Sequence, residues 1–197
     1  GAVYPREFTS AAAESAGLDL RRDTIARTIV HTGPPGVVNA FDSHGLVKIA
    51  RQADCVIRIE KPVGDFLAPG EALFHLRGAR ADAVSESRLR RCVALDSERA
   101  MDSDPVFGFR ILVEIASKAL SPAINDPSTA VLAIDQLEHL LHFVSQRQLD
   151  PGIARDASGE VRLVYRTPCW QDYVTLALTE IRLFGASCTQ VTRRLQA

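Results

Sequence analysis

One polar face on a predicted helix over residues 105–120 holds the first group of side chains that could do chemistry. Arg110, Glu114 and Lys118 are spaced i, i+4 and i+8, which places them on one face at about 100° per residue. Ser121 continues the same face, and apolar residues cover the rest of the helix. The face must therefore meet water, a partner helix or a ligand. We favour a mutually neutralising ladder of charges; the alternative is a cleft wall that recognises an anion or an acyl group.

A second group lies on the next predicted helix, where Asp135, His139 and His142 are spaced i, i+4 and i+7. A carboxylate and two imidazoles on one face could bind a divalent metal. Glu138 stands at the margin of this face, which lies opposite the apolar side of the helix. A solvated polar face explains the pattern without a metal, so we expect neither a metal nor a cofactor.

Between these two helices, residues 121–130 read SPAINDPSTA. Pro122 disfavours helical geometry in the residue before it and so ends the first helix. Asp126 followed by Pro127 predicts an N-cap and a first helical residue, which together start the next helix. The cap would occupy the backbone amides that a phosphate would need. We favour a corner over a polar site, but the corner does not require Asn125 in particular, and Asn125 is the first place to look for function.

Catalytic motifs do not stand out in this chain. There is no G-x-S-x-G, no glycine-rich phosphate loop and no H-E-x-x-H, so we lean against an enzyme. If the chain does bind or convert a small molecule, the polar groups of the helical half would carry that activity. Asp104 and Arg182 would then be tested first, together with the groups named above.

The composition describes an ordinary soluble globular protein, with 46% hydrophobic and 24% charged residues in a chain of 197. A net charge of −1 gives no general attraction to polyanions, so we expect no nucleic-acid partner. The sequence has no apolar run long enough to span a bilayer. Its four cysteines stand far apart, which suits reduced, buried thiols rather than a zinc site.

The elements that must position these residues fall into two halves with different periodicity. Residues 26–80 show short β-branched runs at 26–31, 37–41, 55–59 and 72–76, with a short helix capped by Asp42 or Ser43. Turn dipeptides at residues 64–65 and 69–70 flank one apolar pair. This pattern resembles lipoyl-like barrel-sandwich hybrids of the hammerhead type. Neither lysine of the segment stands in a carrier setting, so we reject a biotin or lipoate arm.

The second half, residues 81–197, has helical periodicity. Helices are predicted at 85–95, at 105–120, from Pro127 onward and at 171–184, with a short strand near 161–165. The expected fold class is therefore α+β. It comprises a lead segment at 1–25, a barrel-sandwich-like β domain at 26–80 and a mainly α-helical domain at 81–197.

Three segments carry a family resemblance: residues 104–110, 119–127 and 180–186. The most specific of these is the pattern ALSP-x-INDP-x-TA. On these segments the chain resembles the "domain of unknown function 2254" family of predicted bacterial membrane proteins, from about residue 2 to its end. It departs from the family pattern at residues 101–103. The resemblance implies transmembrane helices ahead of a soluble C-terminal region, of which this chain would be the soluble part. It implies no established activity.

Two functions follow as hypotheses. The first is a soluble regulatory or assembly domain of an integral membrane protein, a channel or transporter, located at the plasma membrane with this part in the cytoplasm. Leu132 and Phe143 fall outside the main apolar arc of their helix, which predicts packing against a helix or subunit and a homo-oligomer. The N-terminal transmembrane region of the same protein would be a further partner. The alternative is an enzyme or a small-molecule-binding domain that uses Asp104, Arg110 and the Asn125-Asp126 pair, with an unknown ligand.

Overall fold

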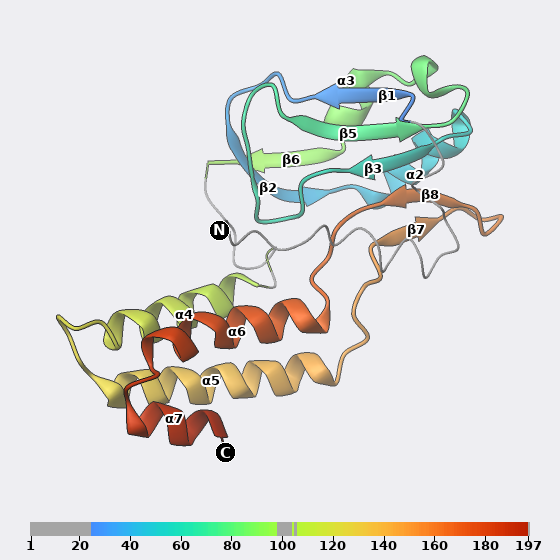
Figure 1. Ribbon diagram of the computed structural model, residues 1–197. Helices are drawn as coiled ribbons and strands as arrows, with labels where there is room; N and C mark the ends of the chain where they lie inside the picture. The colour runs from blue at the N-terminus through green and yellow to red at the C-terminus, as the bar shows by residue number, and fades with distance from the viewer. Residues whose placement is uncertain (1–24, 98–103, 105, 197) are drawn as a thin grey trace. The chain divides into compact units, whose positions relative to one another are not determined.

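The computed structural model describes residues 25–97, 104 and 106–196, and the fold there is α+β (Figure 1). Contacts divide the chain into two compact units. The β unit holds the described residues up to Asp104 together with Asp150–Thr167, and the helical unit holds those of Pro105–Leu149 and Pro168–Ala197. The expected lead segment, apart from Ile25, and the expected helix start at Pro105 lie outside the described residues.

A five-stranded sheet forms one layer of the β unit. Its strand order is β1-β5-β3-β8-β7, and every pair is antiparallel except β3 with β8. The strands are β1 (Arg27–Val30), β3 (Val56–Ile59), β5 (Ala72–Arg77), β7 (Ile153–Arg155) and β8 (Val161–Val164).

A three-stranded sheet with the order β4-β2-β6 forms the second layer. Its strands are β2 (Gly36–Phe41), β4 (Phe66–Leu67) and β6 (Val93–Asp96). The helical segments of this unit are α2 (Ser43–Gln52), a 3-10 turn at Ala81–Ala83 and α3 (Glu86–Arg90). Asp42 caps α2 by accepting a hydrogen bond from the Gly45 amide, which confirms one of the two predicted caps.

One apolar core joins these layers. Ile57 and Ile59 are buried and alternate with the half-buried Val56 and Arg58 along β3, as expected for a strand with one face on a core. They share a single cluster with Val38 of β2, Leu67 of β4 and Leu46 of α2. The two sheets and α2 are therefore held together mainly by the hydrophobic effect.

Two predictions for this part of the chain differ from the structure. The helix predicted at 85–95 ends at Arg90, because the residues after it pair with β2 as β6, with Val93 beside Phe41. The strand expected inside the helical domain is β8, which pairs in parallel with β3 at Ile57 and Leu163. Residues 150–167 thus complete the sheet of the β unit. Both differences arise from pairing between distant segments, which periodicity does not record.

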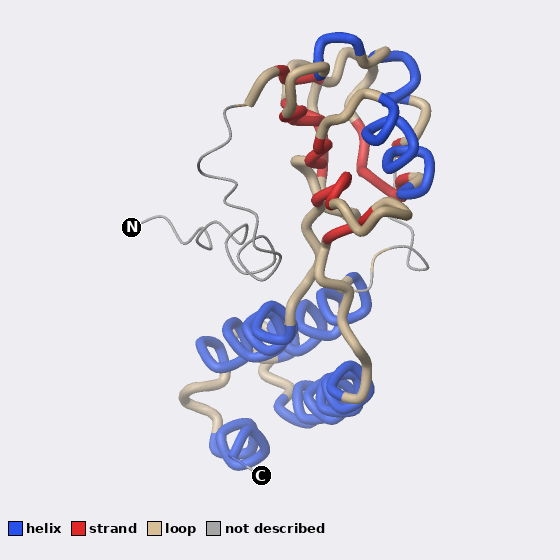
Figure 2. Tube along the Cα trace, turned by 90° about the vertical axis from the view of Figure 1, so that its right-hand side faces the viewer, coloured by secondary structure: helices blue, strands red, loops and turns tan. Residues whose placement is uncertain are grey.

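The helical unit contains α4 (Phe107–Ala119), α5 (Pro127–Ser145), α6 (Trp170–Phe184) and α7 (Thr189–Gln196), as Figure 2 shows in blue. Its core is built from the apolar faces of all four helices. Phe109 of α4 packs on Tyr173 of α6 with ring centroids 5.1 Å apart, a favourable tilted arrangement. Among the described helices, none combines the length and the apolar character needed to cross a bilayer.

Asp104 does not cap the helix that follows it. The N-cap of α4 is Val106, without a side-chain cap, whereas Asp104 is only 3% exposed and belongs to the β unit. Its carboxylate lies against Gly64, where an added Cβ would come within 2.3 Å of Oδ2. Gly64 has a φ of +88°, a conformation that favours glycine. Asp104 therefore contributes to the packing of the turn before β4.

Candidate functional site

The polar face of α4 is not the neutralised ladder that the spacing favours. Glu114 and Lys118 are exposed and Arg110 is half-buried, yet among the described ion pairs none joins these three residues. Ion pairs between exposed side chains four residues apart contribute little, so solvation of each charge competes well with pairing. The Arg110 guanidinium is left without a carboxylate partner among the described residues.

Two polar atoms on this face are buried without a hydrogen-bond partner in the described part of the chain: Arg110 Nε and Ser117 Oγ. The two residues are seven positions apart, so they lie on the same side of α4. Most buried polar atoms in proteins are hydrogen-bonded. This face is therefore the part of α4 with unused capacity to bind a polar group.

The corner between α4 and α5 matches its prediction. Pro127 is the first residue of α5, and the Asp126 carboxylate accepts a hydrogen bond from the Thr129 amide at 3.1 Å. The Thr129 hydroxyl donates a second hydrogen bond to Asp126, at 2.5 Å. Both hydrogen bonds lower the pKa of Asp126, and the bond from the hydroxyl has the larger effect. The predicted cap is confirmed, and both oxygens of the Asp126 carboxylate accept a hydrogen bond within the first turn of α5.

Asn125 is explained by the backbone. Its φ is +49°, in the left-handed region where asparagine is one of the few tolerated residues besides glycine. Its amide donates to the Ser121 carbonyl at 2.9 Å, and the next amide, that of Asp126, donates to the Ala119 carbonyl at 2.8 Å. The Ser121 hydroxyl donates to the Lys118 carbonyl at 2.7 Å. The left-handed residue lets the chain leave α4 and satisfy its last carbonyls.

Of the three weak metal candidates, Asp135 and His142 have different side-chain partners and His139 is exposed. Asp135 accepts a hydrogen bond from Arg194 Nε at 2.5 Å, and Glu138 accepts one from the same guanidinium. His142 Nε2 lies 2.9 Å from the side-chain nitrogen of Gln146. In the described ranges no three His, Cys, Asp or Glu side chains gather into a possible metal site.

Arg194 instead ties α7 to α5. Its two carboxylate partners are Asp135 and Glu138, and their hydrogen bonds raise its pKa further above the ordinary value. The sequence places these partners 59 and 56 positions away. The pairing depends on how α7 folds back on α5, so the sequence alone did not indicate it.

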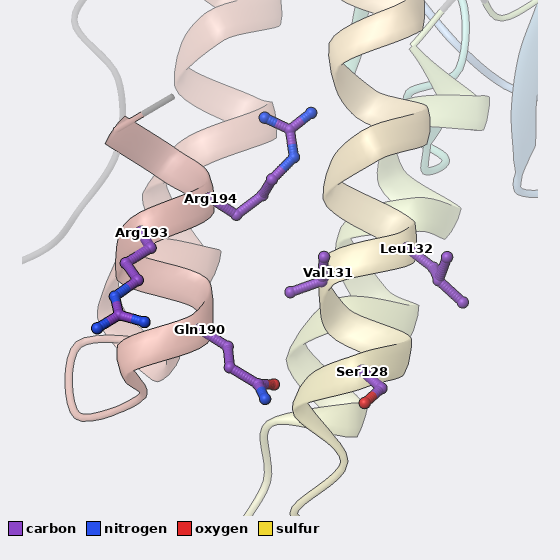
Figure 3. A pocket seen from close by; sticks show the side chains of 6 residues that line it. All are labelled: Ser128, Val131, Leu132, Gln190, Arg193 and Arg194. Atoms are coloured by element: carbon purple, nitrogen blue, oxygen red, sulfur yellow. The ribbon is translucent and has the colours of Figure 1, made fainter.

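A hollow of about 590 Å³ lies beside this ion pair. It is lined by six residues of α5 and α7: Ser128, Val131, Leu132, Gln190, Arg193 and Arg194. Figure 3 shows Val131 and Gln190 directed into the space between the two helices, whereas Leu132 points away from α7. The surface that these residues expose to the hollow is mostly apolar, and the Arg194 guanidinium, which points toward α5, is already paired with two carboxylates. Anion binding is not favoured here.

The outer face of α5 exposes two large apolar side chains; α6 of the same unit also exposes large apolar residues, Leu183 and Phe184 among them. Leu132 is 65% exposed and Phe143 is 54% exposed, and Gln136 and His139 between them are exposed as well. Arg147 stacks over the Phe143 ring at 4.3 Å from its centroid, a cation–π contact. We call Leu132, Gln136, His139 and Phe143 the α5 stripe. The prediction that the two apolar residues lie outside the core of this helix is confirmed.

The remaining candidates are divided between the two units. Arg182 is exposed in the last turn of α6. Asp104 is buried in the β unit. Arg110 and Asp126 belong to the helical unit, where each has the separate surroundings described above. Their role as ligands stays a prediction.

Comparison with known proteins gives the family. A family described as "Predicted membrane protein (DUF2254)" matches residues 6–197. The chain belongs to this family. An uncharacterized protein of Mycobacterium bovis is 28% identical over 189 residues, which cover 93% of this chain and 36% of that protein. An uncharacterized protein of Mycobacterium tuberculosis has the same identity and coverage. No solved structure matches the chain.

The DUF2254 relatives are much longer than the chain, which spans about a third of their length. The family is that of a predicted membrane protein, and the family resemblance expected from residues 104–110, 119–127 and 180–186 is confirmed. The relatives' names assign no activity. Function must therefore be inferred from the surfaces of this DUF2254 chain itself.

Proposed function

We propose that this chain is a soluble regulatory or assembly domain of an integral membrane protein, a channel or transporter, and that it forms a homo-oligomer through the α5 stripe. Membership in a family of predicted membrane proteins supports the context. In the full-length protein the domain follows an N-terminal transmembrane region, which is a further partner. The protein lies in the plasma membrane, with this domain on the cytoplasmic side.

One observation carries the assembly role: two large apolar side chains stand exposed on the same helix. The inward face of α5 already buries Ala130, Ala133, Ile134 and Leu137, so Leu132 and Phe143 serve no purpose in the core. Fully burying a leucine or phenylalanine contributes roughly 1.5–3 kcal/mol per side chain, and Leu132 and Phe143, which are 65% and 54% exposed, would contribute the corresponding share of it. A subunit contact on this face would gain that contribution from both partners.

We propose that the β unit is a lipoyl-like, hammerhead-type barrel-sandwich hybrid, and two features support this. Two sheets share one core, and α2 is inserted between β2 and β3. The turns on either side of β4 contain Gly64 and Gly70, both with positive φ, as the turn dipeptides suggested. No lysine carrier site is proposed for it, and we assign this unit a structural role.

An alternative function, small-molecule binding or catalysis, is favoured by the α4 face alone. Arg110 has no ion-pair partner among the described residues, and its Nε and Ser117 Oγ are buried without hydrogen bonds there. A small carboxylate or phosphate could accept both. If so, acetate or phosphate should raise the melting temperature of the wild type and leave that of Arg110→Ala unchanged. Equal responses in the two proteins would exclude this site.

The assembly role is tested on the full-length protein. Two copies with different affinity tags are expressed together, extracted from membranes with detergent and purified through one tag. We expect the second copy to be recovered with the first, and Phe143→Glu to reduce that recovery. Failure of wild-type copies to purify together would contradict the proposed function.

A further inference from the structure

The α5 stripe has a pattern that reads the same in both directions. Leu132, Gln136, His139 and Phe143 are separated by 4, 3 and 4 residues, which is the heptad spacing of a helix–helix seam. At about 100° per residue the four positions fall within an arc of roughly 60°. All four side chains are exposed. The order along the stripe is apolar, polar, polar, apolar from either end.

We propose that the partner on this stripe is a second copy of the chain, packed with its α5 antiparallel about a two-fold axis. This inference rests on the proposed function and specifies its interface. The axis passes midway between Gln136 and His139. Leu132 then lies opposite Phe143 of the partner subunit, and Gln136 lies opposite His139 of the partner subunit. A two-fold interface repeats each contact.

The side chains are complementary in this register. Leucine meets phenylalanine at both ends of the seam, which buries all four large apolar groups. The Gln136 amide carries both donors and acceptors, so it can bond either tautomer of a neutral imidazole. The carboxylates of Asp135 and Glu138 beside the stripe are already paired with Arg194. No unpaired carboxylate therefore lies beside the seam at these two positions.

Charge favours the antiparallel over the parallel alignment. In a parallel pair Arg147, stacked on Phe143, would lie beside Arg147 of the partner subunit. In the antiparallel register it lies opposite Ser128, next to the end of α5 that carries the Asp126 carboxylate. The macrodipoles of the two helices also oppose each other in this arrangement. Both effects select the two-fold antiparallel pair.

Disulfide cross-linking tests the register directly. Cys92, Cys169 and Cys188, which are exposed or partly exposed, are first replaced by alanine, and Leu132→Cys and Phe143→Cys are made in separate chains. Under mild oxidation we expect a covalent dimer in the mixture of the two chains and little in either chain alone. A covalent dimer of either chain alone that outweighs the mixed one would indicate a parallel pair and overturn the inference.

A charge-swap experiment in the chain with its native cysteines gives a second measurement. By sedimentation, Leu132→Glu and Phe143→Lys should each raise the dimer Kd at least about tenfold, since a charge is desolvated against an apolar group. A chain that carries both changes should regain most of the lost dimer affinity, because the introduced carboxylate and ammonium groups face each other only in the antiparallel register. A double variant weaker than both single variants would overturn the inference.

The outcomes separate the register from the proposed function. The wild-type chain could dimerise while the mixed cysteine variants do not cross-link and the charge swap does not restore dimerisation. In that case the assembly role stands and the antiparallel α5 interface is wrong. A wild-type chain that is monomeric at every concentration would contradict both the assembly role and the antiparallel interface. Circular dichroism of each variant confirms that the helices are retained before association is compared.

Discussion

The Asp126 carboxylate accepts two hydrogen bonds from Thr129 at the start of α5, one from the backbone amide at 3.1 Å and one from the hydroxyl at 2.5 Å. The residue before this pair, Asn125, adopts the left-handed conformation. Together they turn the chain from α4 into α5. The corner is therefore specified by local chemistry, and it sets where the α5 stripe begins.

Replacing Asp126 by alanine should lower the melting temperature by a few degrees, since the first turn of α5 loses its cap. The pKa of Asp126 is lowered in the folded protein, so its contribution is present above the unfolded pKa of about 3.9 and is lost as the pH falls through the folded value. Melting of wild type and Asp126→Ala across the acid range measures this. Asp126→Asn keeps an acceptor and serves as the matched control. Equal melting temperatures at neutral pH would contradict the cap.

Asn125→Ala should destabilise the protein by about 1–2 kcal/mol, because alanine is disfavoured in the left-handed region. Asn125→Gly should be neutral or slightly stabilising, since glycine adopts the same backbone without strain. Urea unfolding of the two variants gives the comparison. If alanine and glycine are equally tolerated, Asn125 is not held in this conformation in solution.

Gly64→Ala and Gly70→Ala form a matched pair in the β unit. Their φ values are +88° and +86°, so both should lose about 1–2 kcal/mol to backbone strain. At Gly64 the new methyl group would also meet the Asp104 carboxylate, whereas nothing lies within 4 Å at Gly70. Urea unfolding should therefore show a larger loss at Gly64, and Asp104→Ala should reduce the difference. Equal losses would contradict the contact.

Stability should fall as the pH drops below the unfolded histidine pKa of about 6.5 because of His75. Burial, chiefly, lowers its pKa in the folded state, against the opposing effect of Glu60. The unfolded chain then binds protons more readily, so the contribution of neutral His75 is present above about pH 6.5 and declines as the pH drops through the folded pKa. Urea midpoints of wild type and His75→Gln over this range test the prediction. The urea midpoint should depend less on pH in the variant than in the wild type. An unchanged pH dependence would assign the effect to other groups.

Local signals in the sequence were sufficient for the caps at Asp42 and Asp126 and for the extents of most helices and strands. These features depend on neighbouring residues, which the sequence shows directly. The left-handed backbone at Asn125 belongs to the same class, and the tolerance of asparagine for that conformation was the signal that could have revealed it.

The features that the sequence did not predict depend on distant segments. β6 forms because Val93 pairs with Phe41, which overrides the local helical pattern. β8 joins the β unit through its parallel pairing with β3. The paired state of Asp135 and Glu138 likewise depends on Arg194 of α7. A helical periodicity or a pattern of carboxylates and histidines cannot report contacts across fifty residues or more.

Sedimentation equilibrium of the purified chain tests the central claim, assembly through the α5 stripe. We expect a concentration-dependent dimer for the wild type and a monomer for Leu132→Glu. We also expect a dimer for Leu183→Glu, which alters a residue of α6 that is 74% exposed and lies outside the stripe. A wild-type chain that stays monomeric at the highest attainable concentration would contradict the claim, as would equal loss of the dimer in both variants.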